Sequence, residues 1–222
     1  MRDLTLVFDL DGTLVDTAPD LVAATNHVLE HVGLPPVDAQ SLRPYIGNGA
    51  RFMIERATHD AVPKLGPEDH ERLLQRFLDY YGRNIAVDSA PFEGTVTALE
   101  AFRDAGAKLA VCTNKMEAMS RLLLDTLDLT HFFQAIAGRD TLSHSKPHPE
   151  HLLGAIRMAG GNPQHAVMIG DSKVDIATAK AANVPVIGVS FGYTDEPLEK
   201  FAPDAMIDHY RDLEAATTAT RR

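Results

Sequence analysis

The feature that most constrains this chain is an apolar run that ends in two closely spaced aspartates. Residues 4–8 read Leu-Thr-Leu-Val-Phe, and Asp9-Leu10-Asp11-Gly12 follows directly. A short apolar run that ends in a turn signal is typical of a buried strand. Side chains alternate along an extended chain, so both carboxylates lie on one side as the chain leaves the strand. They repel each other unless a cation lies between them, and Mg²⁺ favours carboxylate and phosphate oxygens. A plain Asp-Gly turn is the alternative interpretation.

Composition limits the class of protein and its partners. The chain has 222 residues, 45% hydrophobic and 23% charged, which suits one sizeable core with a small second unit. A formal net charge of −10 argues against nucleic acid or an anionic membrane surface as the main partner. The single cysteine, Cys112, lies in an apolar run, which is typical of a small core side chain in a reducing compartment. We find no signal-peptide pattern and no run long enough to span a membrane, and we expect a cytoplasmic protein.

The pattern of periodicity divides the chain into two regions. Residues 16–89 show helical but no strand-like periodicity. Beyond them we expect strands at 108–112, 134–137, 166–169 and 184–189, and helices at 94–105, 116–127, 149–159 and 173–182. This alternation predicts an α/β fold with a Rossmann-like parallel sheet. Residues 1–15 and 90–222 would form the core, with 16–89 inserted after the first strand as a small helical cap. We expect the Ala/Thr-rich tail that ends in Arg221 and Arg222 to be frayed.

Two further motifs carry groups that can bind phosphate. Thr113 and Asn114 follow the second strand, where a hydroxyl and an amide can donate to phosphate oxygens. Capping of the next helix is the alternative role for them. Lys146 lies in a loop braced by Pro147 and Pro149, and a lysine held in this way can neutralise a phosphate. The alternative is a solvated surface lysine.

A fourth motif repeats the pattern of an apolar strand followed by acids. Asp171 follows Gly170 at the strand end, and Asp175 lies four residues further on, where a helix would place both on one side. Asp171 could instead be a simple N-cap. All four motifs end strands or precede helices at what should be one edge of one sheet, where ligands bind in such folds. We therefore expect a metal-assisted phosphoryl-transfer site there.

Together these motifs resemble those of the haloacid dehalogenase superfamily of phosphohydrolases. The segments similar to its four motifs are Phe8 to Thr13, Thr113-Asn114, Lys146-Pro147, and Gly170-Asp171 with Asp175. The resemblance implies that Asp9 is the nucleophile and forms an aspartyl-phosphate. It also implies that Asp11 is the general acid for the leaving alkoxide and then the base for water. Because halide needs no proton to leave, the acid at Asp11 favours phosphate esters as substrates.

The same resemblance implies how the phosphoryl group, the metal and the cap act. Thr113, Asn114 and Lys146 would hold the phosphoryl group. Mg²⁺ would be bound by Asp9, Asp171 and the backbone carbonyl of Asp11, with support from Asp175. The helical insertion would be a mobile cap that closes over the substrate and excludes bulk water.

The predicted cap contains a glycine-rich loop that bears on the choice of substrate. Residues 44–50 resemble the cap loop of phosphoglycolate phosphatases, and residues 191–193 and 203–205 share this resemblance. Glycines let backbone N–H groups approach a small anion closely. We expect the substrate, 2-phosphoglycolate, to contact the loop through Gly47, Asn48 and Gly49. We expect no partner besides this small phosphate ester, and a monomer or a homodimer.

Three alternatives remain open at this point. The enzyme could hydrolyse another small phosphate ester or pyrophosphate. It could also be a phosphomutase of the β-phosphoglucomutase type, in which Arg43 and Arg51 would supply a second phosphate clamp. A phosphate-sensing or scaffolding protein with this fold is the third alternative, but such a protein would be expected to lose Asp9 or Lys146.

Overall fold

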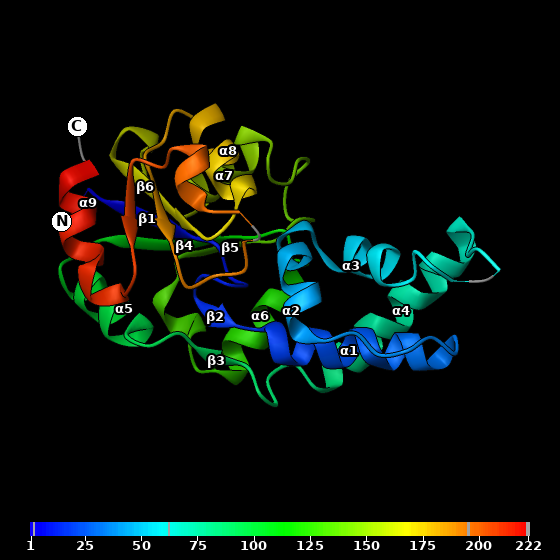
Figure 1. The fold of residues 1–222 in the computed structure, drawn as a ribbon. Coiled ribbons are helices and arrows are strands. Elements are labelled where there is room, and N and C mark those ends of the chain that lie inside the picture. The colour runs from blue at the N-terminus through cyan, green and yellow to red at the C-terminus, as the bar shows by residue number, and fades with distance from the viewer. Residues whose placement is uncertain (2, 62, 195, 221–222) are drawn as a thin grey trace.

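The computed structural model describes residues 1, 3–61, 63–194 and 196–220, and a six-stranded parallel sheet forms the centre of this part of the chain (Figure 1). The strand order is β5-β4-β1-β6-β7-β8, and each neighbouring pair is parallel. The strands are β1 (Thr5–Phe8), β4 (Lys108–Cys112), β5 (Ala135–Ala137), β6 (Ala166–Gly170), β7 (Val186–Val189) and β8 (Ala205–Ile207). The apolar β1 is fully buried between β4 and β6. The α/β fold with a parallel sheet is thus confirmed.

Helices cover both faces of this sheet, as the continuous apolar strands require. Along β1, Leu6 and Phe8 pack on one face and Val7 on the other. The helices on the first face are α5 (Thr95–Asp104), α6 (Glu117–Thr126) and α9 (Leu213–Thr220), and those on the second are α7 (Pro149–Met158) and α8 (Lys173–Ala181). Cys112 is buried on the second face, and burial raises the pKa of its thiol to about 12. It is a core side chain, as predicted.

A helical region lies between two short strands beside the sheet. The strands β2 (Val15–Asp16) and β3 (Ala90–Pro91) pair antiparallel where the chain leaves and re-enters the α/β region. Between them lie α1 (Ala18–His31), α2 (Ala39–Leu42), the 3₁₀ helix η1 (Arg43–Asn48), α3 (Ala50–Ala57) and α4 (Pro67–Arg83), which project to one side (Figure 1). The buried Asp20 carboxylate accepts hydrogen bonds from Ser89 N at 2.9 Å and Ser89 Oγ at 2.6 Å, which ties the two crossings together. We interpret the region 16–89 as the cap.

The structure corrects two details of the predicted elements. The expected frayed tail is wrong for residues 213–220, because Leu213, Thr217 and Thr220 form one buried face of the helix α9, which packs beside β7 and β8. Arg221 and Arg222 lie outside the described residues. The strand expected from 184 begins at Val186, because Val184 N bonds back to Ala179 O and so still closes the preceding helix.

Candidate active site

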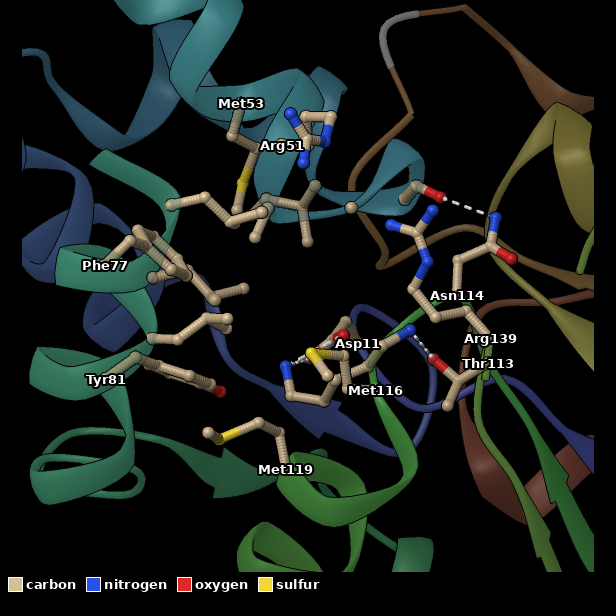
Figure 2. A pocket seen from close by; sticks show the side chains of 18 of the residues that line it. Asp11, Arg51, Met53, Phe77, Tyr81, Thr113, Asn114, Met116, Met119 and Arg139 are labelled. Carbon is tan, nitrogen blue, oxygen red and sulfur yellow. Dashed lines mark hydrogen bonds and ion pairs between the residues drawn. The ribbon is translucent and has the colours of Figure 1, made fainter. Parts of the chain in front are cut away.

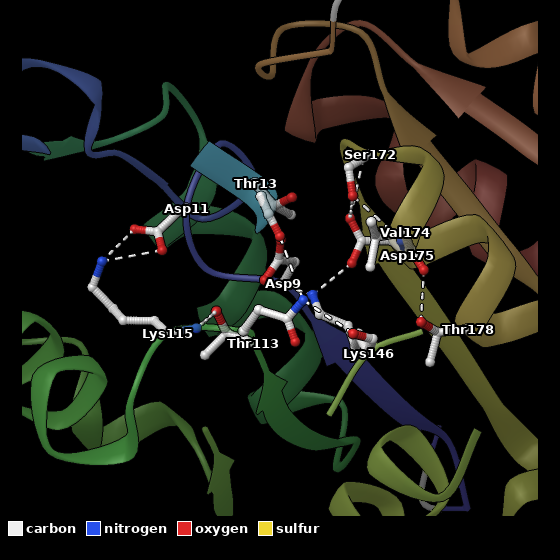
Figure 3. A network of polar contacts seen from close by, with 12 residues as sticks. Asp9, Asp11, Thr13, Thr113, Lys115, Lys146, Ser172, Val174, Asp175 and Thr178 are labelled. Atoms are coloured by element: carbon white, nitrogen blue, oxygen red, sulfur yellow. Dashed lines mark hydrogen bonds and ion pairs between the residues drawn. The ribbon is translucent and has the colours of Figure 1, made fainter. Parts of the chain in front are cut away.

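The four motifs meet at the carboxyl edge of the sheet (Figure 3). Asp9 continues β1, where its N–H donates to Ile169 O of β6 at 2.9 Å. The polar side chains of the four motifs that are buried there are Asp9, Asp11, Thr113, Lys146, Asp171 and Asp175. Burying so many ionisable groups is costly unless they pair with one another or with a ligand. The site therefore has a specific pattern of internal contacts.

Lys146 lies between two carboxylates. Its Nζ is 2.8 Å from Asp9 Oδ1 and 2.6 Å from Asp175 Oδ1. The other oxygen of Asp175 accepts from Ser172 Oγ at 2.6 Å and from Ser172 N, which fixes the carboxylate at the start of α8. Burial alone would lower the pKa of Lys146, but Asp175 and Asp9 raise it above its ordinary value. Lys146 is thus held as a cation beside Asp9.

The carboxylates outnumber this cation. Asp9, Asp171 and Asp175 each offer an oxygen within 4.8 Å of the others. Burial raises the pKa of Asp9 to about 7 against the opposing effect of Lys146, and burial and the neighbouring acids raise that of Asp171 well above its ordinary range. A buried set of oxygen donors with excess negative charge fits a hard divalent cation such as Mg²⁺.

Two glycines let the backbone approach Asp171. Gly12 has φ +83°, and a Cβ at Gly12 or at Gly192 would overlap the Asp171 carboxylate. Beside Gly192, Tyr193 N donates to Asp171 Oδ2 at 2.8 Å, and Thr13 Oγ1 lies 3.3 Å from Oδ1. The segment 191–193 therefore forms one wall of the acidic cluster.

Asp11 has different surroundings from Asp9. Its carboxylate lies 2.8 and 3.1 Å from Lys115 Nζ (Figure 3). Thr17 Oγ1 also donates to it, at 2.7 Å. Lys115 also lies 4.7 Å from the ring centroid of Tyr81, which comes from α4. Burial opposes the charge on Lys115, but Asp11 and Tyr81 raise its pKa above the ordinary value. Lys115 is not among the site residues that the motifs predict, although it directly follows Thr113 and Asn114.

Asn114 joins loops from two regions of the chain. Its Nδ2 donates to Lys146 O at 3.2 Å and to Gly47 O at 3.4 Å. Thr113 Oγ1 accepts from Lys115 N at 3.1 Å. Neither residue caps α6, whose first N–H instead donates to Asp140 at 2.8 Å. This geometry argues against the capping alternative for Thr113 and Asn114.

A cavity of about 230 Å³ opens beside this site, between the helical region and the sheet edge (Figure 2). Its wall includes Asp9, Asp11, Thr113 and Asn114. The helical region supplies a mostly apolar side, formed by Leu21, Ile46, Met53, Leu74, Phe77, Leu78 and Tyr81. Gly47 and Gly49 also line the cavity, whereas the exposed Asn48 does not. The structure therefore brings two of the three predicted loop residues to the cavity.

His151 is a buried neighbour of Lys146 that the sequence did not single out as part of this site. Its Nδ1 accepts from Lys146 N at 3.0 Å, and its Nε2 lies 3.0 Å from Gly138 O. Burial and the nearby Lys146 charge lower the pKa of the imidazole to about 4. A neutral His151 thus ties the Lys146 loop to the residue after β5.

Comparison with known proteins agrees with this geometry. The sequence pattern of haloacid dehalogenase-like hydrolases matches residues 6–189. The chain belongs to this family. A phosphoglycolate phosphatase of Mesorhizobium japonicum is 50% identical over 208 residues, which cover 94% of this chain and 92% of the relative. One from Caulobacter vibrioides is 46% identical over 216 residues, covering 97% and 91% of the two chains.

A solved structure extends the likeness to three dimensions. A crystal structure described as a predicted phosphoglycolate phosphatase from Haemophilus somnus superposes with a TM-score of 0.91 at 31% identity. It covers 98% of this chain, and this chain covers 99% of it. Within the described part of this hydrolase, no helix has both the length and the apolar character needed to cross a membrane.

Proposed function

We propose that this hydrolase is a Mg²⁺-dependent phosphatase that converts 2-phosphoglycolate to glycolate and phosphate through an aspartyl-phosphate. The observation that carries the proposal is the placement of two acids at one cavity, with Asp9 paired to Lys146 and Asp11 paired to Lys115. The names of the relatives and their identity to this chain support the substrate.

The two acids would act together in both steps of the reaction. In the first step an oxygen of Asp9 attacks phosphorus and the bond to the glycolate oxygen breaks, while Asp11 gives that oxygen a proton. In the second, water attacks the phosphorus of the aspartyl-phosphate, Asp11 takes a proton from the water, and Asp9 is released. Lys146 lies beside Asp9, where its charge would stabilise the phosphoryl oxygens. Thr113 and Asn114 would donate further hydrogen bonds to this group.

The metal would be held by residues of the acidic cluster. Asp9, Asp171 and the backbone carbonyl of Asp11 are the proposed ligands of Mg²⁺. Asp175 supports them, since both of its oxygens already contact Lys146 or Ser172. When bound, the ion would neutralise charge on the transferring phosphoryl group.

The cavity suits a small substrate kept from bulk water. Its apolar cap side would exclude water once the substrate is bound and so strengthen electrostatic contacts inside. Gly47 and Gly49 leave room for the backbone near a small anion, and we assign no substrate contact to the exposed Asn48. We further propose a cytoplasmic location, supported by the free, buried thiol of Cys112.

The contacts of two arginines favour hydrolysis over a mutase reaction. Arg43 lies 3.5 Å from Asp16 and 5.4 Å from the ring centroid of Tyr193. Arg51 is paired with Glu71. Both arginines that the sequence suggested as a second phosphate clamp thus contact a carboxylate of this chain.

Phosphate release with and without Mg²⁺ tests the proposal. The panel would contain 2-phosphoglycolate, hexose 1- and 6-phosphates, pyrophosphate and nucleotides. We expect Mg²⁺-dependent release with a strong preference for 2-phosphoglycolate. A preference for another ester would contradict the substrate, and an isomerised sugar phosphate without phosphate release would indicate a mutase.

A further inference from the structure

Three cationic side chains line the cavity, and they differ in their surroundings. Arg51 is paired with Glu71 on the helical region. Arg139 is exposed, and its guanidinium reaches toward the glycine loop, where Nη1 lies 3.5 Å from the position of a Cβ on Gly49 (Figure 2). Lys115 is the most enclosed of the three, with 8% of its side chain exposed. Its ammonium lies deepest beside the reacting groups.

The wall around Lys115 provides few competing partners. Its Nζ contacts the Asp11 carboxylate and faces the ring of Tyr81, and Met116 and Met119 line the same side of the cavity. A lysine ammonium carries three donors. The short contact to Asp11 Oδ1 uses one of these donors, so Lys115 can also donate to a substrate group in the cavity.

The length of glycolate places its carboxylate near this ammonium. One methylene separates the carboxylate carbon from the leaving oxygen, so the carboxylate oxygens lie within about 4 Å of that oxygen. Asp11, acting as the acid, must lie within hydrogen-bond reach of the same oxygen. Lys115 Nζ is only 2.8 Å from Asp11 Oδ1. A substrate bound for reaction therefore brings its carboxylate to the neighbourhood of Lys115.

We propose that Lys115 is a specificity-determining residue that binds the carboxylate of the substrate. This inference rests on the proposed function, because it assigns a contact to 2-phosphoglycolate. The ammonium bridges Asp11 and the substrate carboxylate, so it recognises an anion at one fixed distance from the scissile bond. A two-carbon phosphate ester without a carboxylate lacks this contact.

The test compares 2-phosphoglycolate with ethyl phosphate, which has the same two-carbon chain without the carboxylate. For the wild type we expect a higher kcat/KM for 2-phosphoglycolate. In Lys115→Gln the ratio of the two kcat/KM values should fall about 10- to 150-fold, the size of a hydrogen bond to a charged group. Lys200→Gln is the matched control and should keep the ratio within about threefold, because Lys200 pairs with Glu196 and does not line the cavity. Arg139→Gln tests the other cation that faces the substrate side of the cavity.

Other outcomes would overturn the inference. If Lys115 only positions Asp11, both substrates lose activity together and the ratio stays constant. A fall of the ratio in Arg139→Gln with none in Lys115→Gln would assign the carboxylate to Arg139. If the wild type does not prefer 2-phosphoglycolate at all, it is the proposed function that fails.

A second measurement needs no variant and so does not depend on Lys115→Gln folding. The substrate 3-phosphooxypropanoate has one more methylene between the ester oxygen and the carboxylate. We expect its kcat/KM to be at least about tenfold below that of 2-phosphoglycolate, because its carboxylate extends past Lys115. Equal values for the two esters would contradict a carboxylate contact at this position.

Discussion

At the scale of single residues, two aspartates only two positions apart have different environments. Asp9 shares Lys146 with Asp175, whereas Asp11 is held by Lys115 and Thr17. The spacing of Asp9 and Asp11 was visible in the sequence, and so was their place at the end of a strand. The partner of Asp11 was not, because pairing with Lys115 depends on how β1 and β4 lie side by side in the sheet.

The acid–base role of Asp11 gives a first prediction. Asp11→Asn keeps the shape of the side chain but cannot transfer a proton, so kcat for 2-phosphoglycolate should fall about 100- to 10,000-fold. Asp140→Asn is the control: Asp140 lines the same cavity, but its carboxylate contacts Glu117 N. Steady-state phosphate release measures both. A loss below tenfold in Asp11→Asn would reject the role.

His151 gives a prediction about pH. Its pKa in the folded protein is about 4, below the ordinary 6.5, and Lys146 is the charged group it faces. Between these values the unfolded chain binds a proton that the folded protein does not. The contribution of the neutral His151 imidazole to the stability of the fold is thus complete above pH 6.5 and is lost as the pH falls toward 4.

Thermal or urea unfolding of His151→Gln against wild type measures this contribution. The free energy of unfolding of the wild type exceeds that of His151→Gln, and this difference should shrink by up to about 1.4 kcal/mol per pH unit as the pH falls from 6.5 toward 4. The exposed His165 supplies a control, since His165→Gln should follow the wild-type profile. Parallel profiles for His151→Gln and wild type would show that the imidazole is not held neutral.

At the scale of elements, the sequence predicted the long elements well and the short ones poorly. The strands β1, β4 and β6 are apolar runs of four or five residues, which composition alone reveals. Both β2 and β3 have two residues, too few for any periodicity. They pair with each other where the chain leaves and re-enters the α/β region, which the local sequence does not indicate. The contact of Asn114 with Gly47 O likewise depends on tertiary packing.

The loop between η1 and α3 carries a prediction about specificity. Gly49 has φ +92°, so Gly49→Ala should lower the free energy of unfolding by about 1–3 kcal/mol. Because Gly49 lines the cavity, kcat/KM for 2-phosphoglycolate should fall more than that for p-nitrophenyl phosphate. Gly33→Ala is the control: Gly33 also has a positive φ, +70°, with open space around the new Cβ, and it does not line the cavity. This control should lower stability without changing the ratio of the kcat/KM values for the two substrates. If that ratio is the same in Gly49→Ala and Gly33→Ala, the loop does not determine specificity.

At the scale of the whole molecule, an acidic protein places two lysines at its candidate site, where the aspartates still outnumber them. The net charge is −10, yet Lys115 and Lys146 both lie at the cavity edge of the sheet. The parallel sheet and its carboxyl-edge site could be predicted from the order of the motifs. The position of the helical region over that edge depends on contacts between residues far apart in the sequence, such as Ser89 with Asp20 and Asn114 with Gly47, which periodicity does not reveal.

The excess of buried carboxylate predicts a response to metal. Mg²⁺ at about 100 times its Kd should stabilise the fold by about 2.7 kcal/mol, which raises Tm by about 5–10 °C in a chain of this size. Sodium chloride at equal ionic strength is the control, and Asp171→Asn should lose most of the Mg²⁺ effect. A shift no larger than that with sodium would argue against a metal at Asp9 and Asp171.

The most direct test of the account is to trap the phosphoenzyme. Wild-type protein with Mg²⁺ and 2-phosphoglycolate labelled with ³²P would be quenched in acid within the first turnover, and the labelled peptide identified by mass spectrometry. We expect label on the peptide that contains Asp9, and neither label nor steady-state turnover in Asp9→Asn. Label on another residue, or sustained hydrolysis by Asp9→Asn, would contradict it.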